Sequence, residues 1–123
     1  MGIGFDKSIG MHSAALLLRE QRAEVLASNI ANADTPGYKA KDLDFKQALE
    51  IMKKSSSLAG QSSVNRSVFV KYRVPNQPDT GDGNTVDMAH EKMAYAQNAL
   101  DYQTSFQILD GRIKGMMKAI RGE

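Results

Sequence analysis

Two histidines are the residues of this chain best suited to bind a metal or to transfer protons near neutral pH. His12 falls on the apolar side of the first predicted helix, and His90 falls in the first turn of the last predicted helix. Neither belongs to an HExxH or similar metal-ligand spacing. We therefore interpret both as structural or solvated side chains rather than ligands.

The acidic residues do not assemble a site either. Asp42 lies close to Asp44, and Asp79 lies close to Asp82, but both pairs fall in segments without a rigid scaffold. The run DTGDGN at residues 79–84 loosely resembles a calcium-binding loop, yet it lacks the glutamate that such a loop needs at its twelfth position. The glycines of this run do not follow a strand of a βαβ unit, so they carry no signal of a phosphate-binding loop.

Cysteine is absent, which excludes disulfides, zinc–thiolate sites and cysteine nucleophiles. Serines are abundant, but no set of nucleophile, base and orienting group can be drawn from the sequence. We therefore assign no catalytic, cofactor-binding or metal residues. The sequence indicates a protein that is not an enzyme and has no small-molecule substrate.

The charge is nearly balanced, with 16 basic and 14 acidic residues and a net charge of +2. This balance argues against a nucleic-acid partner, which would need a basic face. No apolar run reaches the roughly 18 residues of a membrane-spanning helix. The N-terminus lacks the pattern of a cleaved secretory signal, so we expect any export to use a route that reads an uncleaved N-terminus.

Two long helices are expected to position everything else. Apolar residues recur at helical spacing in the first part of the chain and predict an amphipathic helix over residues 8–33. Arg19 and Arg22 interrupt or flank its apolar face. Ser8 is the expected N-cap, and residues 1–7 are expected to fray.

A turn must follow this helix. Pro36 fixes φ at the second turn position and pushes Thr35 out of the α region, so the helix must end before it. Gly37 supplies the positive φ that a type II turn needs at its third position. Asn29 and Asn32 can bond to nearby backbone and tolerate the left-handed conformation at a helix end.

Residues 34–54 are predicted to contain this turn and a short helix. Asp42 or Asp44 could cap the start of that helix or favour it through the helix dipole. Phe45 and Leu49 stand one helical turn apart. Taken alone, they are interpreted as a packing pair that stabilises a short helix.

The middle of the chain, residues 55–85, is predicted to be a loose loop because it is rich in serine, glycine and proline and has no helical period. Within it, alternation over residues 67–74 predicts a short strand. So long a stretch of weak structure in a small protein indicates a segment that a partner orders.

A second long helix is predicted over residues 86–121, with Asp87 as its N-cap. Its apolar residues keep a 3–4 spacing over nearly five heptads, which is typical of a coiled-coil seam. The residues expected to form the packing seam of the two long helices are Leu16, Ile30, Tyr95, Tyr102, Phe106, Leu109, Ile113 and Ile120.

The predicted fold class is therefore mainly α. The N- and C-terminal helices pair as an antiparallel, coiled-coil-like hairpin, and an irregular middle holds a short helix and a short β segment, all in one domain over residues 1–123. One short hairpin cannot bury two wide apolar faces, so the remaining apolar surface predicts self-assembly or helical partners. Two function classes fit: a structural subunit, or a soluble cytoplasmic helical interaction module such as an export chaperone or adaptor.

Two segments resemble bacterial flagellar axial proteins. SNIANADTPGYKA at residues 28–40 is similar to the signature of the flagellar rod and hook proteins, and GDGNTVDM at residues 81–88 resembles the smallest, proximal members of the basal-body rod family. The chain departs from the family pattern at Ala89 and His90, where an acidic residue and an arginine are usual. The motif residues are Asn29, Asn32, Thr35, Pro36, Gly37 and Tyr38 in the first segment, and Asp82, Gly83, Asn84, Thr85, Val86 and Asp87 in the second.

The resemblance implies a non-enzymatic subunit of the flagellar rod that assembles helically in the periplasm and transmits motor torque to the hook. It implies export through the flagellar type III apparatus, and partners that are other copies of the chain and other rod and basal-body proteins. Phe45 and Leu49 are similar to a Phe-x-x-x-aliphatic motif read at the export gate. The turn at Pro36–Gly37 would end an inner-tube helix and send the chain outward toward adjoining subunits.

Overall fold

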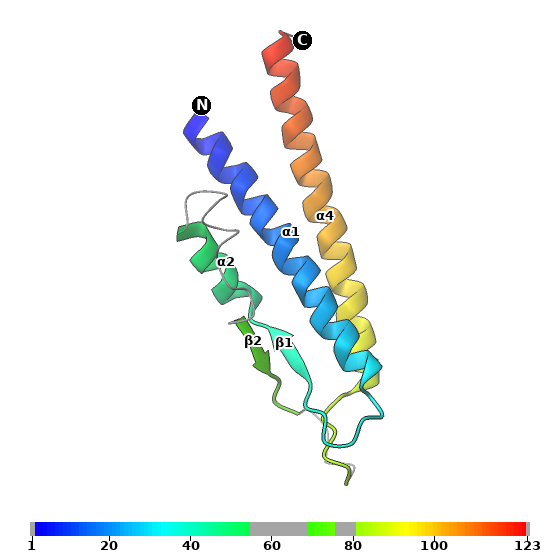
Figure 1. Cartoon of the computed structure of the whole chain (residues 1–123). Helices are drawn as coiled ribbons and strands as arrows, with labels where there is room; N and C mark the ends of the chain where they lie inside the picture. Colours follow the sequence, from blue (N-terminus) through cyan, green and yellow to red (C-terminus); the bar gives the residue numbers. More distant parts are fainter. Residues whose placement is uncertain (1, 55–68, 76–80, 123) are drawn as a thin grey trace.

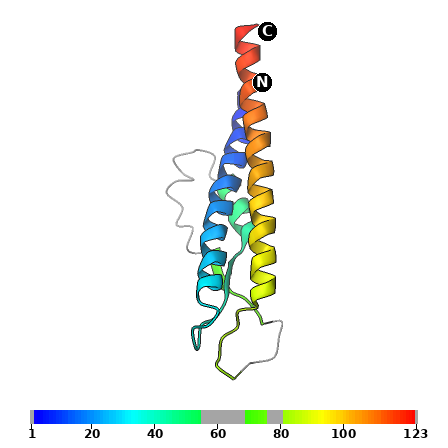
Figure 2. The same cartoon turned by 90° about the vertical axis from the view of Figure 1, so that its right-hand side faces the viewer.

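The computed structural model describes residues 2–54, 69–75 and 81–122. In chain order its elements are α1 (Gly2–Ala31), β1 (Lys41–Leu43), α2 (Phe45–Lys54), β2 (Val70–Tyr72) and α4 (Met88–Arg121). The two long helices run antiparallel and side by side, and α2 and the two strands lie against the other side of α1 (Figure 1, Figure 2). The prediction of a mainly α chain built on two paired terminal helices is confirmed.

Helix α1 starts six residues earlier than predicted. It begins at Gly2, so Ser8 is not its N-cap, and residues 2–7, which were expected to fray, are helical. No proline lies between Gly2 and Ser8, and extending a formed helix is far easier than nucleating a new one. The helix ends at Ala31, ahead of Thr35 and Pro36 as expected.

The two strands form a small antiparallel sheet in which Lys41 pairs with Tyr72 and Leu43 with Val70. The strand predicted over residues 67–74 is present but shorter, and residues 67 and 68 lie outside the described part of the chain. Its partner β1 was not predicted, because Lys-Asp-Leu has no strand pattern of its own and becomes a strand only beside β2.

Helix α2 is the predicted short helix, and Asp44 caps it. The Asp44 carboxylate accepts the backbone N–H of Gln47 at 3.2 Å, and its carbonyl accepts that of Ala48 at 3.0 Å. The other cap candidate, Asp42, lies in β1 and is engaged elsewhere.

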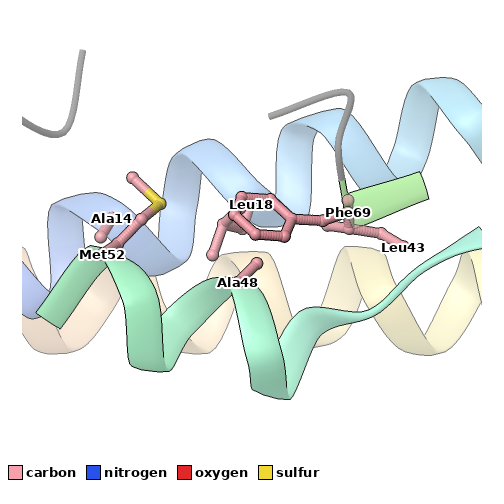
Figure 3. Packing of buried hydrophobic residues seen from close by; sticks show 6 residues of the cluster. All are labelled: Ala14, Leu18, Leu43, Ala48, Met52 and Phe69. Carbon is pink, nitrogen blue, oxygen red and sulfur yellow. The ribbon is translucent and has the colours of Figure 1, made fainter. Parts of the chain in front are cut away.

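The main apolar cluster lies between α1, α2 and the sheet rather than between the two long helices (Figure 3). Partly buried Phe45, Leu49 and Val70 pack against it. The buried members of the cluster are Ala14, Leu18, Leu43, Ala48, Met52 and Phe69.

Helix α4 presents a different face to α1 than its apolar pattern predicted. Its buried residues and the next half-buried ones form a 3–4 line, here called the inner line: Glu91, Ala94, Asn98, Asp101 and Ser105. Over residues 91–105 this line lies one residue before the predicted seam. Since an α-helix turns about 100° per residue, the helix is rotated by about that angle from the predicted orientation.

The predicted seam of α4 is consequently wrong as an interface within the chain. Tyr95 is 43% exposed, Phe106 53% and Ile120 78%. Tyr102 and Ile113 are also exposed, and only Leu109 is half-buried. These five exposed residues, Tyr95, Tyr102, Phe106, Ile113 and Ile120, are called the α4 stripe below. On α1, Leu16 and Ile30 are half-buried.

The start of α4 agrees closely with the prediction made from the sequence. Asp87 is the N-cap, with extended backbone (φ −100°, ψ 104°) and a carboxylate that accepts the His90 N–H at 3.3 Å. The helix begins at Met88 rather than at residue 86. Of the helices that the structure describes, none is long and apolar enough to cross a membrane.

Candidate functional site

The turn after α1 has the geometry that its residue types predicted. The Thr35 carbonyl accepts the Tyr38 N–H at 3.2 Å, which places Pro36 and Gly37 at the two central positions. Gly37 has φ +75°, as the third position of a type II turn requires. A Cβ built on Gly37 would meet no heavy atom within 4 Å, so glycine is needed there for its backbone conformation rather than for space.

We expect Gly37→Val to lower the free energy of unfolding by about 2 kcal/mol, because the left-handed region is unfavourable for L-residues and most so for β-branched ones. Chemical denaturation followed by circular dichroism measures the change. Gly111, a glycine inside α4 whose added Cβ would also meet nothing, is the control. Gly111→Ala should stabilise the chain by about 1 kcal/mol. Equal effects at the two glycines would contradict the assignment of the turn.

The second sequence motif lies directly against this turn. The Asn84 side-chain Nδ2 lies 2.9 Å from each of three carbonyl oxygens, those of Asn32, Ala33 and Thr35. Its Oδ1 accepts the Val86 N–H at 2.8 Å, so the buried amide uses both of its ends. Asn84 thereby binds the carbonyls of the segment that follows α1.

Backbone and hydroxyl bonds continue the contact along both segments. Gly37 N–H donates to the Asp82 carbonyl at 2.8 Å, and Thr85 N–H donates to the Tyr38 carbonyl at 3.0 Å. The Thr85 hydroxyl oxygen accepts the Ala40 N–H at 2.7 Å. Residues 81–85, which were predicted to belong to a loose loop, form no helix or strand, and these bonds hold them against the turn. We call the bonded segments 32–41 and 81–87 the joint, and we include in it the side chains that extend these contacts, described next: Arg22, Asn29, Asp42, Arg73 and Glu91.

Asn29, at the end of α1, connects four parts of the chain through one buried side chain. Its Nδ2 donates to the Lys41 carbonyl at 2.7 Å and to the Glu91 carboxylate at 3.0 Å. Its Oδ1 accepts the Lys41 N–H at 3.1 Å and the Tyr38 hydroxyl at 3.2 Å. The amide bonds both backbone groups of Lys41 as a neighbouring strand would, and it ties β1 to α1, α4 and the turn.

A chain of charges extends this connection into the sheet. Glu91, fully buried on α4, is paired with Arg73, which follows β2. Arg73 also bonds the Asp42 carboxylate at 2.8 Å, and Arg22 of α1 bonds the same carboxylate at 3.0 and 3.3 Å. The two arginines and two carboxylates compensate one another, as buried charges must.

The pKa of Asp42 reflects these partners. Burial by itself would raise the pKa of the Asp42 carboxyl. Hydrogen bonds from Arg22 and Arg73 outweigh that effect and hold the pKa below its ordinary value. Asp42 is therefore charged at neutral pH and binds the sheet to α1.

The structure brings the two sequence motifs together but leaves the other predicted residues elsewhere. Phe45 and Leu49 lie at the apolar cluster, where the Arg19 guanidinium lies 3.8 Å from the centroid of the Phe45 ring. The α4 stripe lies outside both the cluster and the joint. Sequence reasoning did not identify the charges of the joint, although one signal was present, since Arg22 interrupts the apolar face of α1.

The side chains of the joint hold the main chain in place. Its amides, hydroxyl and carboxylates bond one another and the main chain. Within the described ranges, no three His, Asp or Glu side chains are grouped so that they could hold a metal ion. What the joint can do is fix the directions of α1, α4 and the sheet relative to one another.

Comparison with known proteins gives a consistent result. A family model described as flagella basal body rod protein matches residues 10–39. The flagellar basal body rod protein FlgB of Aeromonas hydrophila is 47% identical over 132 residues, covering 100% of this chain and 99% of that protein. The FlgB proteins of Cereibacter sphaeroides and Escherichia coli K12 are 45% and 41% identical, covering 98% and 94% of this chain.

Proposed function

Since the chain belongs to the family of flagellar basal body rod proteins, as one of its FlgB members, we propose that it forms the rod through contacts between copies along the α4 stripe. The protein is a structural subunit of the flagellar basal body, and its role in motility is mechanical. In this proposal the copies assemble helically in the periplasm into the proximal part of a drive shaft that transmits motor torque. They also contact the other rod and basal-body proteins.

The observation that carries the proposal is the exposure of the α4 stripe. Five large apolar side chains at heptad-like spacing, between 37% and 78% exposed, lie along a 34-residue helix. Contiguous apolar surface of this kind marks a protein interface. The C-terminal end of α4 also extends past the N-terminal end of α1 in both views (Figure 1, Figure 2), so none of the described helices lies beside this end.

A second copy of the chain is the occupant that fits best. The stripe residues lie seven, four, seven and seven positions apart, a heptad-like spacing that suits contact with a long helix of a neighbouring copy. In the proposed contact the stripe of one copy meets a different face of the next copy, and such a head-to-tail contact generates a helical filament when its rotation does not close into a ring. The joint would then give every copy the same geometry, which a shaft under torque requires.

Polar substitution within the α4 stripe tests the assembly. We expect Phe106→Gln with Ile113→Gln to leave the folded monomer intact, because both side chains are already exposed, and to abolish rod assembly. Electron microscopy of purified basal bodies and the motility of the strain measure the outcome. Met93→Gln with Leu100→Gln, which changes two exposed apolar residues of α4 outside the stripe, is the matched control. Normal rods in the stripe variant would contradict the proposal.

The purification of basal bodies also distinguishes a rod subunit from the alternative class of protein, a cytoplasmic helical interaction module. A cytoplasmic export chaperone or adaptor would stay in the soluble fraction, whereas a rod subunit co-purifies with basal bodies. Sequence identity over nearly the whole length of FlgB proteins favours the rod subunit. Export through the flagellar type III apparatus, without a cleaved signal, is part of the proposal.

Phe45 and Leu49 are the proposed residues of the export-gate motif. Both are partly buried against the apolar cluster, and Arg19 covers the Phe45 ring, so the motif is accessible in an unfolded chain rather than in the folded one. Recognition before folding agrees with export of an unfolded subunit.

We expect Phe45→Ala with Leu49→Ala to block secretion of the protein, as measured by its amount outside the cytoplasm. These changes also damage the cluster, so Met52→Ala is the matched control: Met52 is fully buried in the same helix and cluster but is not part of the motif. It should destabilise the fold by about 2–5 kcal/mol and leave secretion unchanged. Equal secretion by the two variants would leave Phe45 and Leu49 with a packing role only.

A further inference from the structure

Helix α4 offers two packing lines to a partner helix, one residue apart, and the chain uses the less apolar of the two. The inner line, which faces α1, contains Glu91, Asn98 and Asp101 together with small residues. The α4 stripe contains two tyrosines, a phenylalanine and two isoleucines. Hydrophobic burial by itself favours the rotation of α4 that would bury the stripe against α1. Another interaction must therefore decide the orientation.

Asn98 is the polar residue at the centre of the contact between α1 and α4. It is 1% exposed, and its Nδ2 donates to the backbone carbonyl of Arg19 at 2.8 Å. One turn further, Asp101 lies 3.4 Å from the Arg19 guanidinium. A rotation of α4 by one residue would break both contacts.

At this position Asn98 also lowers the stability of the fold. Within the described residues its Oδ1, although buried, accepts no hydrogen bond, and the Arg19 Nε has no partner either. A leucine of similar volume would remove this unpaired oxygen, and it would also remove the hydrogen bond to the Arg19 carbonyl. A buried polar residue that lowers stability is best known for fixing the alignment of paired helices, where a single asparagine excludes alternative arrangements.

We propose that Asn98 is the residue that selects which face of α4 packs against α1, and that it thereby keeps the α4 stripe exposed. The joint anchors the start of α4 through Glu91, and Asn98 lies about 10 Å further along the helix, two turns beyond that anchor. Asn98 therefore fixes the rotation in the part of the helix that the joint does not reach. It is a positioning residue.

Neighbouring single cysteines measure the rotation directly, since the chain has no cysteine of its own. Ala94→Cys places a thiol on the inner line, and Tyr95→Cys places one on the stripe. In the dilute, isolated full-length protein, the thiol at position 95 should react faster with a maleimide than the thiol at position 94. Adding Asn98→Leu should lower this ratio of rates by about tenfold, the population change that corresponds to about 1.4 kcal/mol of lost orientational preference.

The matched control is Gln103→Leu, which adds the same side chain at an exposed position of α4 and should leave the ratio unchanged. Far-ultraviolet circular dichroism should show that Asn98→Leu keeps its helices. An unchanged thiol ratio in Asn98→Leu would overturn the proposal. Loss of the helices would overturn it too, because a role in orientation alone predicts that they persist.

The use of the exposed stripe between copies rests on the proposed function, whereas the thiol measurement on the isolated chain does not. Asn98→Leu should also reduce rod assembly, because a rotated α4 buries the stripe. A changed thiol ratio with normal rods would support the orienting role of Asn98 and contradict assembly through the stripe.

Discussion

Replacing Asn84 by alanine should lower the free energy of unfolding by about 3 kcal/mol, because it removes the donor for three carbonyls and the acceptor for the Val86 N–H. These groups lie between two segments that meet only when the chain is folded, so water does not replace the lost bonds freely. Urea denaturation followed by circular dichroism measures the loss. Changes of this size are expected only from a few mechanisms, and stranding buried polar groups is one of them.

Two variants make this test specific to the amide of Asn84. Asn84→Asp keeps the size of the side chain but turns a carboxylate oxygen toward the three carbonyls, so it should destabilise at least as much as alanine. Asn32→Ala, in the same joint, removes two exposed bonds, one to the Ser28 carbonyl at 2.8 Å and one from the Thr35 hydroxyl at 3.1 Å, and should cost about 0.5–1.5 kcal/mol. If Asn84→Ala lowered the free energy of unfolding no more than Asn32→Ala did, Asn84 would not hold the joint.

Removing the buried carboxylate of Glu91 is the second large effect that we expect. Glu91→Ala should lower the free energy of unfolding by about 3–5 kcal/mol, because it leaves the Arg73 guanidinium and the Asn29 amide without their partner on α4. Arg73 keeps its bond to Asp42, which prevents a larger loss. The same denaturation experiment measures the change.

The contribution of the charge itself can be separated from that of the side chain. Glu91→Gln keeps an oxygen that can accept from Asn29 but removes the charge that faces Arg73, and it should cost about 1.5–3 kcal/mol. Asp101→Ala breaks a partly exposed ion pair with Arg19 on the same inner line and should cost at most about 1 kcal/mol. A Glu91→Ala variant as stable as Asp101→Ala would show that the buried charge does not hold α4 to the sheet.

Both predictions concern how one part of the chain is held against another, and this has a mechanical meaning in a rod subunit. Asn84 fixes the end of α1 to the start of α4, and Glu91 fixes α4 to the sheet. If the copies transmit torque, a subunit with a loosened joint should assemble less well even when its helices remain formed. We therefore expect both alanine variants to reduce motility more than the exposed control variants do.

The sequence by itself determined the local features of this protein. The cap at Asp87 and the turn at Thr35–Gly37 depend on side chains within a few residues of the backbone they shape, so residue type and spacing were sufficient to predict them. The two long helices were predicted for the same reason, because helical periodicity is a property of a single segment.

The pairing of the two motifs was decided only by the tertiary structure. Asn84 and the carbonyls it binds are separated by 49 to 52 residues, and nothing in either segment indicates the other. Strand β1 likewise exists because β2 lies beside it.

The orientation of α4 is the clearest case. An apolar pattern shows which face of a helix is most hydrophobic, but it does not show whether that face meets its own chain or another one. Here the contacts of Glu91 and Asn98 with α1 and the sheet accompany a rotation of about 100° from the face that the pattern favours. The apolar residues of the α4 stripe could thus be identified from the sequence. Their exposure depends on contacts within the chain that form only when it is folded.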